Sequence, residues 1–204
     1  MYRTTVRAAM LAALLSLFLL SGLCVWGCDK VEPPAAPEEE ETAADGGGTS
    51  GDSVTVTLYF RRPSGNQDWL YPTQTTVIGA TDPYLTAMEQ LIKGPAEGTQ
   101  LYPVLPDTVK VLDIDVAGGI CTVNVSKEIL TDANQVGVSA SGEGLALAAI
   151  ADTLTEFEDV DRVALFIEGL QSGMIEGRFV EDFWGHMGLP AFLERNEEVI
   201  YSGP

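Results

Sequence analysis

Cysteine, histidine and basic side chains are scarce in this 204-residue chain, and each scarcity excludes a class of protein. The three cysteines, Cys24, Cys28 and Cys121, cannot build an even-numbered disulfide framework or paired CxxC metal knuckles. Eleven Lys and Arg residues stand against 30 Asp and Glu residues, which gives a net charge of −19. Binding of phosphate backbones needs clustered basic side chains, so we exclude nucleic acid as a partner.

The single histidine, His186, limits a Ser-His-Asp triad to one place in the chain. No G-x-S-x-G elbow accompanies it, since the stretch 137–141 lacks the last glycine. We therefore predict a protein with no catalytic residues, and we keep a hydrolase that uses His186 with nearby acids as an alternative. Asp113 and Asp115 are interpreted as a solvated strand face, and 142–144 lacks the third glycine of a dinucleotide fingerprint. We predict no cofactor and no metal site.

The N-terminus has the layout of a bacterial lipoprotein signal. Arg3 and Arg7 precede an almost uninterrupted apolar stretch over residues 8–25, which is typical of a signal sequence. Gly27 and Cys28 then resemble a lipobox, in which a small residue precedes the cleaved bond. We predict cleavage after residue 27 and lipidation of Cys28, for instance by palmitate, with an uncleaved transmembrane anchor as the alternative. Both readings place the protein on the outer face of the cytoplasmic membrane.

Composition divides the remainder of the chain into a tether and one domain. Residues 28–52 comprise the lipidated cysteine and a stretch rich in Pro, Glu and Gly that cannot bury apolar area, so we predict a disordered acidic tether. Residues 53–204 follow as the folded domain with its C-terminal tail. The chain is about 46% apolar, which suffices for one ordinary core.

Periodicity and turn residues place the first elements of the domain. Apolar and polar residues alternate over 54–60, which predicts a half-buried strand, and 70–78 is read as a second strand. Asp82 and Pro83 can begin a helix that Gly94 and Pro95 end. A hairpin is predicted over 108–126, with Gly118 and Gly119 as its tight turn.

The chain is organised around residues 144–169. Apolar residues recur there at helical spacing, with Asp152 and Glu156 on the side expected to face water, and an apolar strand over 163–167 follows. A helix that leads into a buried strand predicts a two-layer α/β sandwich. Between the two elements lies an acidic run that we interpret as a contact patch for a basic partner, with a solvated loop as the alternative. Its members are Glu156, Glu158, Asp159 and Asp161.

Five segments between Val54 and Ile200 share the pattern of a known domain. They are the strand VTLYF, the helix AMEQLIKGP, the hairpin LPDTVKVLDIDVAGGICTVNVSKEIL, the pair ALAAIADTLTEFEDVDRVALFIEG and the ending PAFLERNEEVI. The most specific positions are L-x-x-G-P at Leu91, Gly94 and Pro95, and the V-x-L-x-I-x-G ending. Together these segments resemble the GerMN domain, the sporulation and spore-germination module of bacterial lipoproteins. The stretches 137–144 and 174–187 depart from the pattern.

The resemblance implies an α+β fold of β-α-β-β-α-β type, with two helices on one small mixed sheet, similar to ring-building motifs of secretion and sporulation assemblies. It also implies a membrane-tethered, non-enzymatic binding or scaffolding module in sporulation, spore germination or cell-envelope assembly. The partners implied are other envelope proteins and peptidoglycan, with a homo-oligomer left open. A peptidoglycan- or polysaccharide-binding protein is the alternative, and it requires Trp69, Tyr71 and Trp184 to cluster in a groove.

Overall fold

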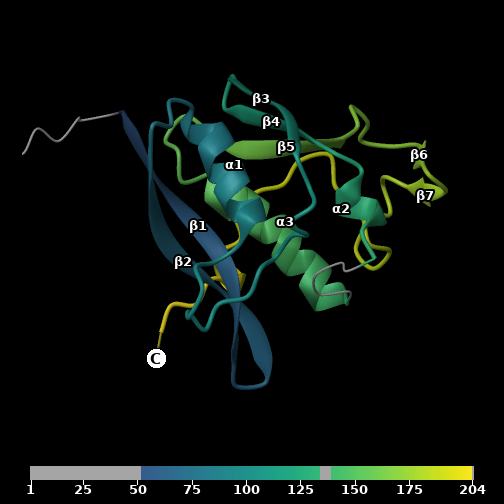
Figure 1. Cartoon of the computed structure of the whole chain (residues 1–204). Helices are drawn as coiled ribbons and strands as arrows, with labels where there is room; N and C mark the ends of the chain where they lie inside the picture. The colour runs from purple at the N-terminus through teal and green to yellow at the C-terminus, as the bar shows by residue number, and fades with distance from the viewer. Residues whose placement is uncertain (1–51, 134–138, 204) are drawn as a thin grey trace, which may run out of the picture. The chain divides into compact units, whose positions relative to one another are not determined.

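A computed structural model describes residues 52–133 and 139–203 (Figure 1). Cys28, the expected signal peptide and nearly all of the expected tether lie outside the described residues. Within the described part, no helix has the length and apolar character needed to cross a membrane.

The domain begins with a long antiparallel hairpin of β1 (Ser53–Ser64) and β2 (Gln67–Ile78). Its two-residue turn has Gly65 at a φ of 66°, which glycine adopts without strain. β1 continues through Pro63. The strand tolerates this proline because a two-stranded hairpin leaves each strand an outer edge, where a missing N–H loses no ladder bond.

Helix α1 (Pro83–Lys93) has the limits that the sequence predicts. The Asp82 carboxylate accepts the N–H of Leu85 at 2.9 Å, and Gly94 ends the helix with a φ of 87°. Met88 and Leu91 on its inner face are fully buried. Local chemistry therefore fixes this helix at both ends.

The second sheet has three strands in the order β3-β4-β5. β3 (Val111–Ala117) and β4 (Ile120–Val125) form the predicted hairpin, and β5 (Arg162–Ile167) pairs in parallel with β4. Gly118 and Gly119 make the turn with φ values of 58° and 80°. A Cβ on Gly119 would lie 2.2 Å from a carboxylate oxygen of Asp161, so a side chain at this position would displace that carboxylate.

Between β4 and β5 the chain forms a short helix, α2 (Glu128–Thr131), and the long helix α3 (Ala140–Leu154). α3 begins four residues earlier than expected, because the Ser139 hydroxyl caps it by accepting the N–H of Gly142 at 3.1 Å. The expectation that Asp152 faces water is wrong, since this residue is fully buried. The C-terminal segment covers that side of the helix.

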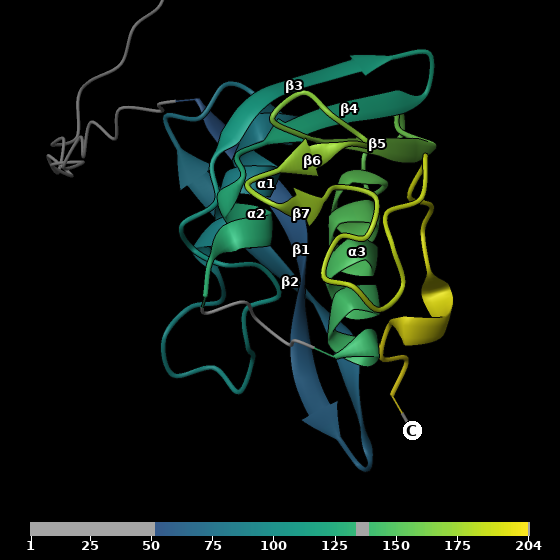
Figure 2. The ribbon, with the colours of Figure 1, turned by 90° about the vertical axis from the view of Figure 1, so that its right-hand side faces the viewer.

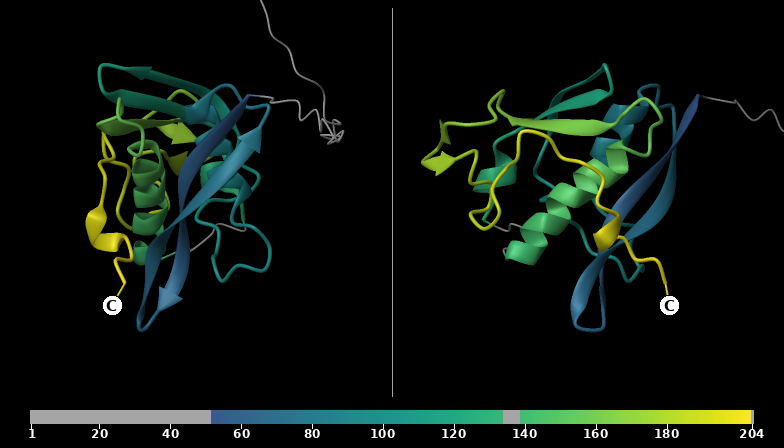
Figure 3. Two further views of the ribbon diagram at one scale, coloured as in Figure 1. Left: turned by 90° about the vertical axis from the view of Figure 1, so that its left-hand side faces the viewer. Right: turned by 180° about the vertical axis from the view of Figure 1, so that it is seen from behind.

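The α+β class is confirmed, and the elements from β2 to β5 follow the order β-α-β-β-α-β once α2 is set aside. The expectation of one small mixed sheet is wrong, because the strands fall into three separate sheets. Both helices contact β1, and in addition α1 contacts β3 and α3 contacts β5. Figures 2 and 3 show the hairpin and the three-stranded sheet meeting the helices from different sides. The helices therefore pack against both of the larger sheets.

The C-terminal part is mostly irregular. Within the stretch 174–187, the chain turns at Glu176 and Gly177 and forms the small antiparallel pair β6 (Met174–Ile175) and β7 (Arg178–Phe179). Residues 193–201, here called the C-terminal strap, contain the 3-10 turn η1 (Glu197–Val199). The strap joins the two larger sheets, since Leu193 pairs with Val163 of β5 and Ile200 pairs with Leu70 of β2.

Candidate functional site: an apolar groove along helix α3

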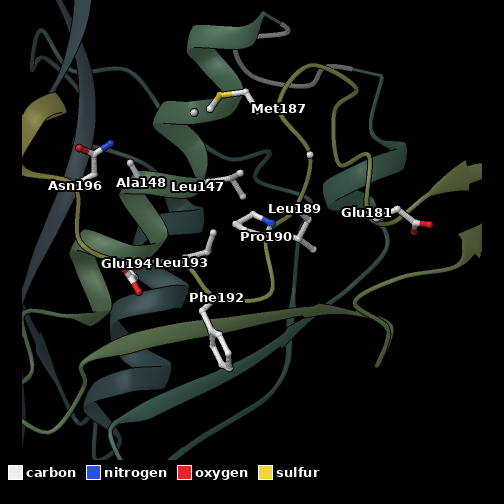
Figure 4. Close-up of a pocket in the computed structure, with 12 residues that line it drawn as sticks. Leu147, Ala148, Glu181, Met187, Leu189, Pro190, Phe192, Leu193, Glu194 and Asn196 are labelled. Atoms are coloured by element: carbon white, nitrogen blue, oxygen red, sulfur yellow. The ribbon is translucent and has the colours of Figure 1, made fainter.

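A hollow of about 570 Å³ lies on the side of α3 that faces the C-terminal segment (Figure 4). Gly144, Leu147 and Ala148 of α3 line its floor, and residues 187–190 and 192–194 line its walls. A second hollow of about 490 Å³ shares Gly144, Met187 and Asn196 with the first, and it reaches residues 66–68 at the tip of the β1–β2 hairpin. We call the two hollows together the α3 groove.

The wall formed by residues 186–188 is held in place by a buried carboxylate, Glu143. One of its oxygens accepts the N–H of His186 at 2.8 Å, and the other accepts those of Met187 at 3.1 Å and Gly188 at 3.0 Å. His186 Nδ1 lies 3.1 Å from the first oxygen. The carboxylate is fully buried and satisfies three backbone donors that would otherwise lack partners. In the sequence, Glu143 stands between two glycines just before the predicted helical pattern over residues 144–169, and nothing local indicates this role.

A second buried carboxylate, Asp152, holds the C-terminal strap against α3. It accepts the N–H of Asn196 at 2.7 Å, while its other oxygen has no hydrogen-bond partner among the described residues. Burial raises the pKa of Asp152 to about 6, because the charged form loses water. Nothing in its sequence position distinguished Asp152 from a solvated helix residue.

Arg195 completes the attachment of the strap. Its guanidinium donates to the carbonyl of Asp152 at 3.2 Å, to Glu156 at 2.7 Å and to the hydroxyl of Tyr59 at 2.9 Å. Tyr59 also donates to Glu156 at 2.7 Å. Burial and the hydrogen bond to Glu156 raise the pKa of Tyr59 to about 12, so the phenol stays protonated. The network joins β1, α3 and the strap at the end of the groove.

The four acids of the predicted contact patch are all exposed at the end of α3. Two of them also have structural contacts, since Glu156 belongs to the Arg195 network and Asp159 accepts a hydrogen bond from Tyr84. Asp161 packs over the Gly119 turn. Glu158 forms no hydrogen bond or ion pair within the described part of the chain. A contact role for Glu156, Glu158, Asp159 and Asp161 stays a prediction.

The aromatic groove required for polysaccharide binding does not form. Trp184 is buried and donates to the carbonyl of Ile129 at 2.8 Å. Trp69 and Tyr71 lie elsewhere, on β2, where both pack against Tyr201 of the strap with ring centroids at 6.2 and 4.4 Å. Arg62 covers the Tyr71 ring from 5.0 Å. These rings therefore pack on one another and hold the end of the strap.

The hydrolase alternative depends on His186, whose imidazole meets the Glu143 carboxylate. Within the described residues, no serine or threonine hydroxyl forms a hydrogen bond with this ring. Glu143 is already occupied by backbone N–H groups, so it acts as an anchor for residues 186–188. The described residues contain no group of three His, Cys, Asp or Glu side chains placed to hold a metal ion. Cys121 is fully buried, and this burial raises the pKa of its thiol to about 12.

Residues 57–172, more than half of the chain, match the family described as Germane, sporulation and spore germination. The chain belongs to this family. Among solved structures, the tandem GerMN domains of the sporulation protein GerM from Bacillus subtilis share 21% identity with a TM-score of 0.56, over 72% of this chain and 47% of that one. The match thus spans about half of the tandem structure. This likeness supports the same α+β fold.

Two further solved structures have lower TM-scores. The first GerMN domain of GerM from Bacillus subtilis shares 20% identity with a TM-score of 0.47, over 69% of this chain and 97% of that one. A presumed lipoprotein from Clostridium perfringens shares 22% identity with a TM-score of 0.45, over 70% of this chain and 87% of that one. No curated protein sequence matches the chain.

Only part of the α3 groove lies within the residue range that matches the family. Its floor on α3 lies within residues 57–172, whereas its walls and acidic rim, between Glu181 and Asn196, come after the matched range. The groove is therefore built partly from the Germane domain and partly from a segment that the family description does not cover.

Proposed function

We propose that this Germane-family protein is a lipid-anchored, extracytoplasmic binding or scaffolding module that acts in sporulation, spore germination or cell-envelope assembly. The observation that carries the proposal is the open α3 groove, an apolar hollow on the surface of a domain from a sporulation family. Its buried carboxylates, Glu143 and Asp152, are engaged in holding backbone N–H groups. A site organised in this way suits binding of another molecule.

The anchor is proposed from the sequence of residues 1–28, with Cys28 as the lipidated residue. Metabolic labelling with a clickable palmitate analogue tests it directly. We expect label on the wild-type chain and none on Cys28→Ala, because the thiol is the acceptor of the acyl chain. An unlabelled wild-type chain that still sediments with membranes would instead favour the uncleaved N-terminal helix.

The partners are proposed to be other envelope proteins. Crosslinking of intact cells followed by isolation of the protein tests this, with Cys28→Ala as the control for correct placement at the membrane. We expect specific crosslinked proteins with the wild type and their loss in the control. Recovery of peptidoglycan fragments or of a second copy alone would change the identity of the partner, and recovery of nothing specific would reject the proposal.

A non-enzymatic role is proposed because the one histidine faces a carboxylate that already anchors a loop. His186→Ala keeps the backbone N–H that Glu143 accepts, so the loop should remain in place. We expect His186→Ala cells to sporulate, germinate and assemble their envelope as the wild type does. A loss of function with a normally folded protein would revive the hydrolase alternative.

A further inference from the structure

We propose that the α3 groove binds a basic, amphipathic segment of a partner protein, with apolar side chains on α3 and Lys or Arg side chains facing Glu181 and Glu194. This inference rests on the proposed function as a binding module, and it names the surface and the chemistry of the partner. The acidic run Glu156–Asp161 lies at another place, near the end of α3.

The groove leaves apolar side-chain surface exposed. Met187 on its wall is 64% exposed, whereas Leu147 and Ala148 of the floor are buried. Phe192 is 40% exposed, and the Arg162 guanidinium covers part of its ring from 4.2 Å. Exposed apolar surface of this kind is typical of a binding surface, because its contacts with water are unfavourable. A segment that fills the hollow would cover these side chains.

The acidic residues beside the groove indicate that the partner is basic. Two acids, Glu181 and Glu194, line the first hollow, and none of the described residues that line it is Lys, Arg or His. Figure 4 shows these two side chains on opposite sides of the apolar floor. A second copy of this chain carries the same net charge of −19, so it would bring acid toward acid. A segment with basic residues flanking its apolar residues is complementary to both rim acids.

Neither rim acid is engaged in an ion pair within the described residues. Hydrogen bonds from its own backbone N–H and from the N–H of Gly173, at 2.8 Å, lower the pKa of Glu181. Glu194 is exposed and forms no hydrogen bond or ion pair with the described residues. A Lys or Arg can therefore reach either carboxylate without breaking an existing ion pair.

The shape of the groove suits a short helix or an extended stretch. The part of α3 that lines it runs from Ala140 to Ala148, a length of about 12 Å at 1.5 Å per residue. Met187 lies over Gly144, where its sulfur would be 3.0 Å from an added Cβ, and its unbranched side chain can move to fit an incoming residue. An amphipathic helix in an apolar groove is a common mode of recognition.

The groove is formed before any partner arrives. Glu143 fixes the wall at residues 186–188, Asp152 fixes Asn196, and the Val163–Leu193 pair fixes the lower wall. Because these contacts exist in the chain alone, binding need not order the walls, and this reduces the entropy lost on association.

A labelled 14-residue amphipathic peptide of Leu and Lys tests the proposal. A peptide with the same apolar pattern, in which Glu replaces Lys, is the negative control. The full-length chain is held in nanodiscs of zwitterionic lipid, and empty nanodiscs give the background. Fluorescence anisotropy measures binding to the wild type and to Glu181→Lys/Glu194→Lys. The matched control is Glu89→Lys/Glu97→Lys, which changes the net charge equally at exposed positions on α1 and in the loop after it. Glu194→Lys alone guards against misfolding, because Glu194 makes no contact that the fold needs.

We expect the Leu/Lys peptide to bind and the Leu/Glu peptide not to bind. The groove double variant should weaken binding at least about fivefold, Glu194→Lys about twofold to threefold, and the control double variant less than twofold, in line with the modest strength of exposed charge pairs. Labelled methionine methyl groups locate the peptide, so the signal of Met187 should shift while that of exposed Met174 stays unchanged. Equal weakening by both double variants, or equal shifts at Met174 and Met187, would overturn the proposal.

The same variants separate this inference from the proposed function. If Glu181→Lys/Glu194→Lys captures the same crosslinked envelope proteins as the wild type, the groove is not the binding surface, although the protein remains a binding module. If the wild type captures nothing specific, the proposed function itself fails.

Discussion

The two long helices of the domain are held in different ways. α1 has one buried face and an exposed face, and a side-chain cap and a glycine define its ends. α3 is buried almost all round, because the hairpin, the three-stranded sheet and α1 all contact it and the C-terminal segment covers the side that remains. Its two buried acids each hold the backbone of that segment. A helix can thus hold a segment without regular secondary structure through buried carboxylates. The space between the two attachments, at Glu143 and Asp152, is the α3 groove.

Removal of the attachment made by Glu143 should cause the largest loss of stability. Glu143→Ala leaves three backbone N–H groups of residues 186–188 without their acceptor, so we expect a loss of about 3–5 kcal/mol in the free energy of unfolding. Urea unfolding followed by tryptophan fluorescence measures it. Glu89→Ala on the exposed face of α1 is the control and should change stability by less than about 0.5 kcal/mol. Similar effects at both positions would mean that the two helices do not differ as described.

The contribution of the second attachment, made by Asp152, to the free energy of unfolding should depend on pH. The pKa of Asp152 in the folded protein is about 6, above the ordinary value of 3.8, so the protonated form is favoured by folding. Its contribution to stability is complete below pH 4 and is lost as pH rises through 6, with a total of about 3 kcal/mol. Arg195, Glu197 and Glu156 are the charged groups that act on it.

Asp152→Asn tests this, because the amide oxygen can still accept the N–H of Asn196 but does not titrate. We expect the difference in unfolding free energy between the variant and the wild type to grow in favour of the variant from pH 4 to pH 7. A difference that is constant with pH would show that Asp152 is not desolvated in the folded chain.

On α1 the corresponding change should be smaller. Asp82→Ala removes the acceptor for the Leu85 N–H but leaves the packing of the helix intact, so we expect a loss of about 1 kcal/mol. Asp82→Asn retains an oxygen that can cap the helix, so this variant should keep most of the stability that Asp82→Ala loses. A loss as large as that of Glu143→Ala would remove the contrast between the helices.

The smallest effect is expected inside the groove. Gly144→Ala improves helix propensity, and the only close contact of the new Cβ is the flexible end of Met187. We expect a gain of about 0.5–1 kcal/mol in unfolding free energy. Weaker binding of the Leu/Lys peptide should accompany it if Met187 has to move into the groove. A loss of stability would mean that Met187 is fixed where it lies.

Much of the fold could be predicted from local patterns. The alternation over Val54–Phe60, the caps of α1 and the Gly118–Gly119 turn each satisfy a local rule, and the structure has these elements. The groove could not be predicted in this way, since Glu143 precedes the predicted helical pattern and Asp152 lies on the side of it expected to face water. Their partners lie 43–45 positions away, and no local pattern joins them.

The sequence by itself determined the kinds of elements, their order and the membership of the Germane family, because these depend on periodicity, capping and turn residues within short windows. The tertiary structure alone decided that the strands divide among separate sheets and that residues 181–196 lie against α3. It also decided that two acids lose their water there. Burial depends on what the rest of the chain places over a residue, and hydrogen bonds across such distances form only when packing brings their partners together.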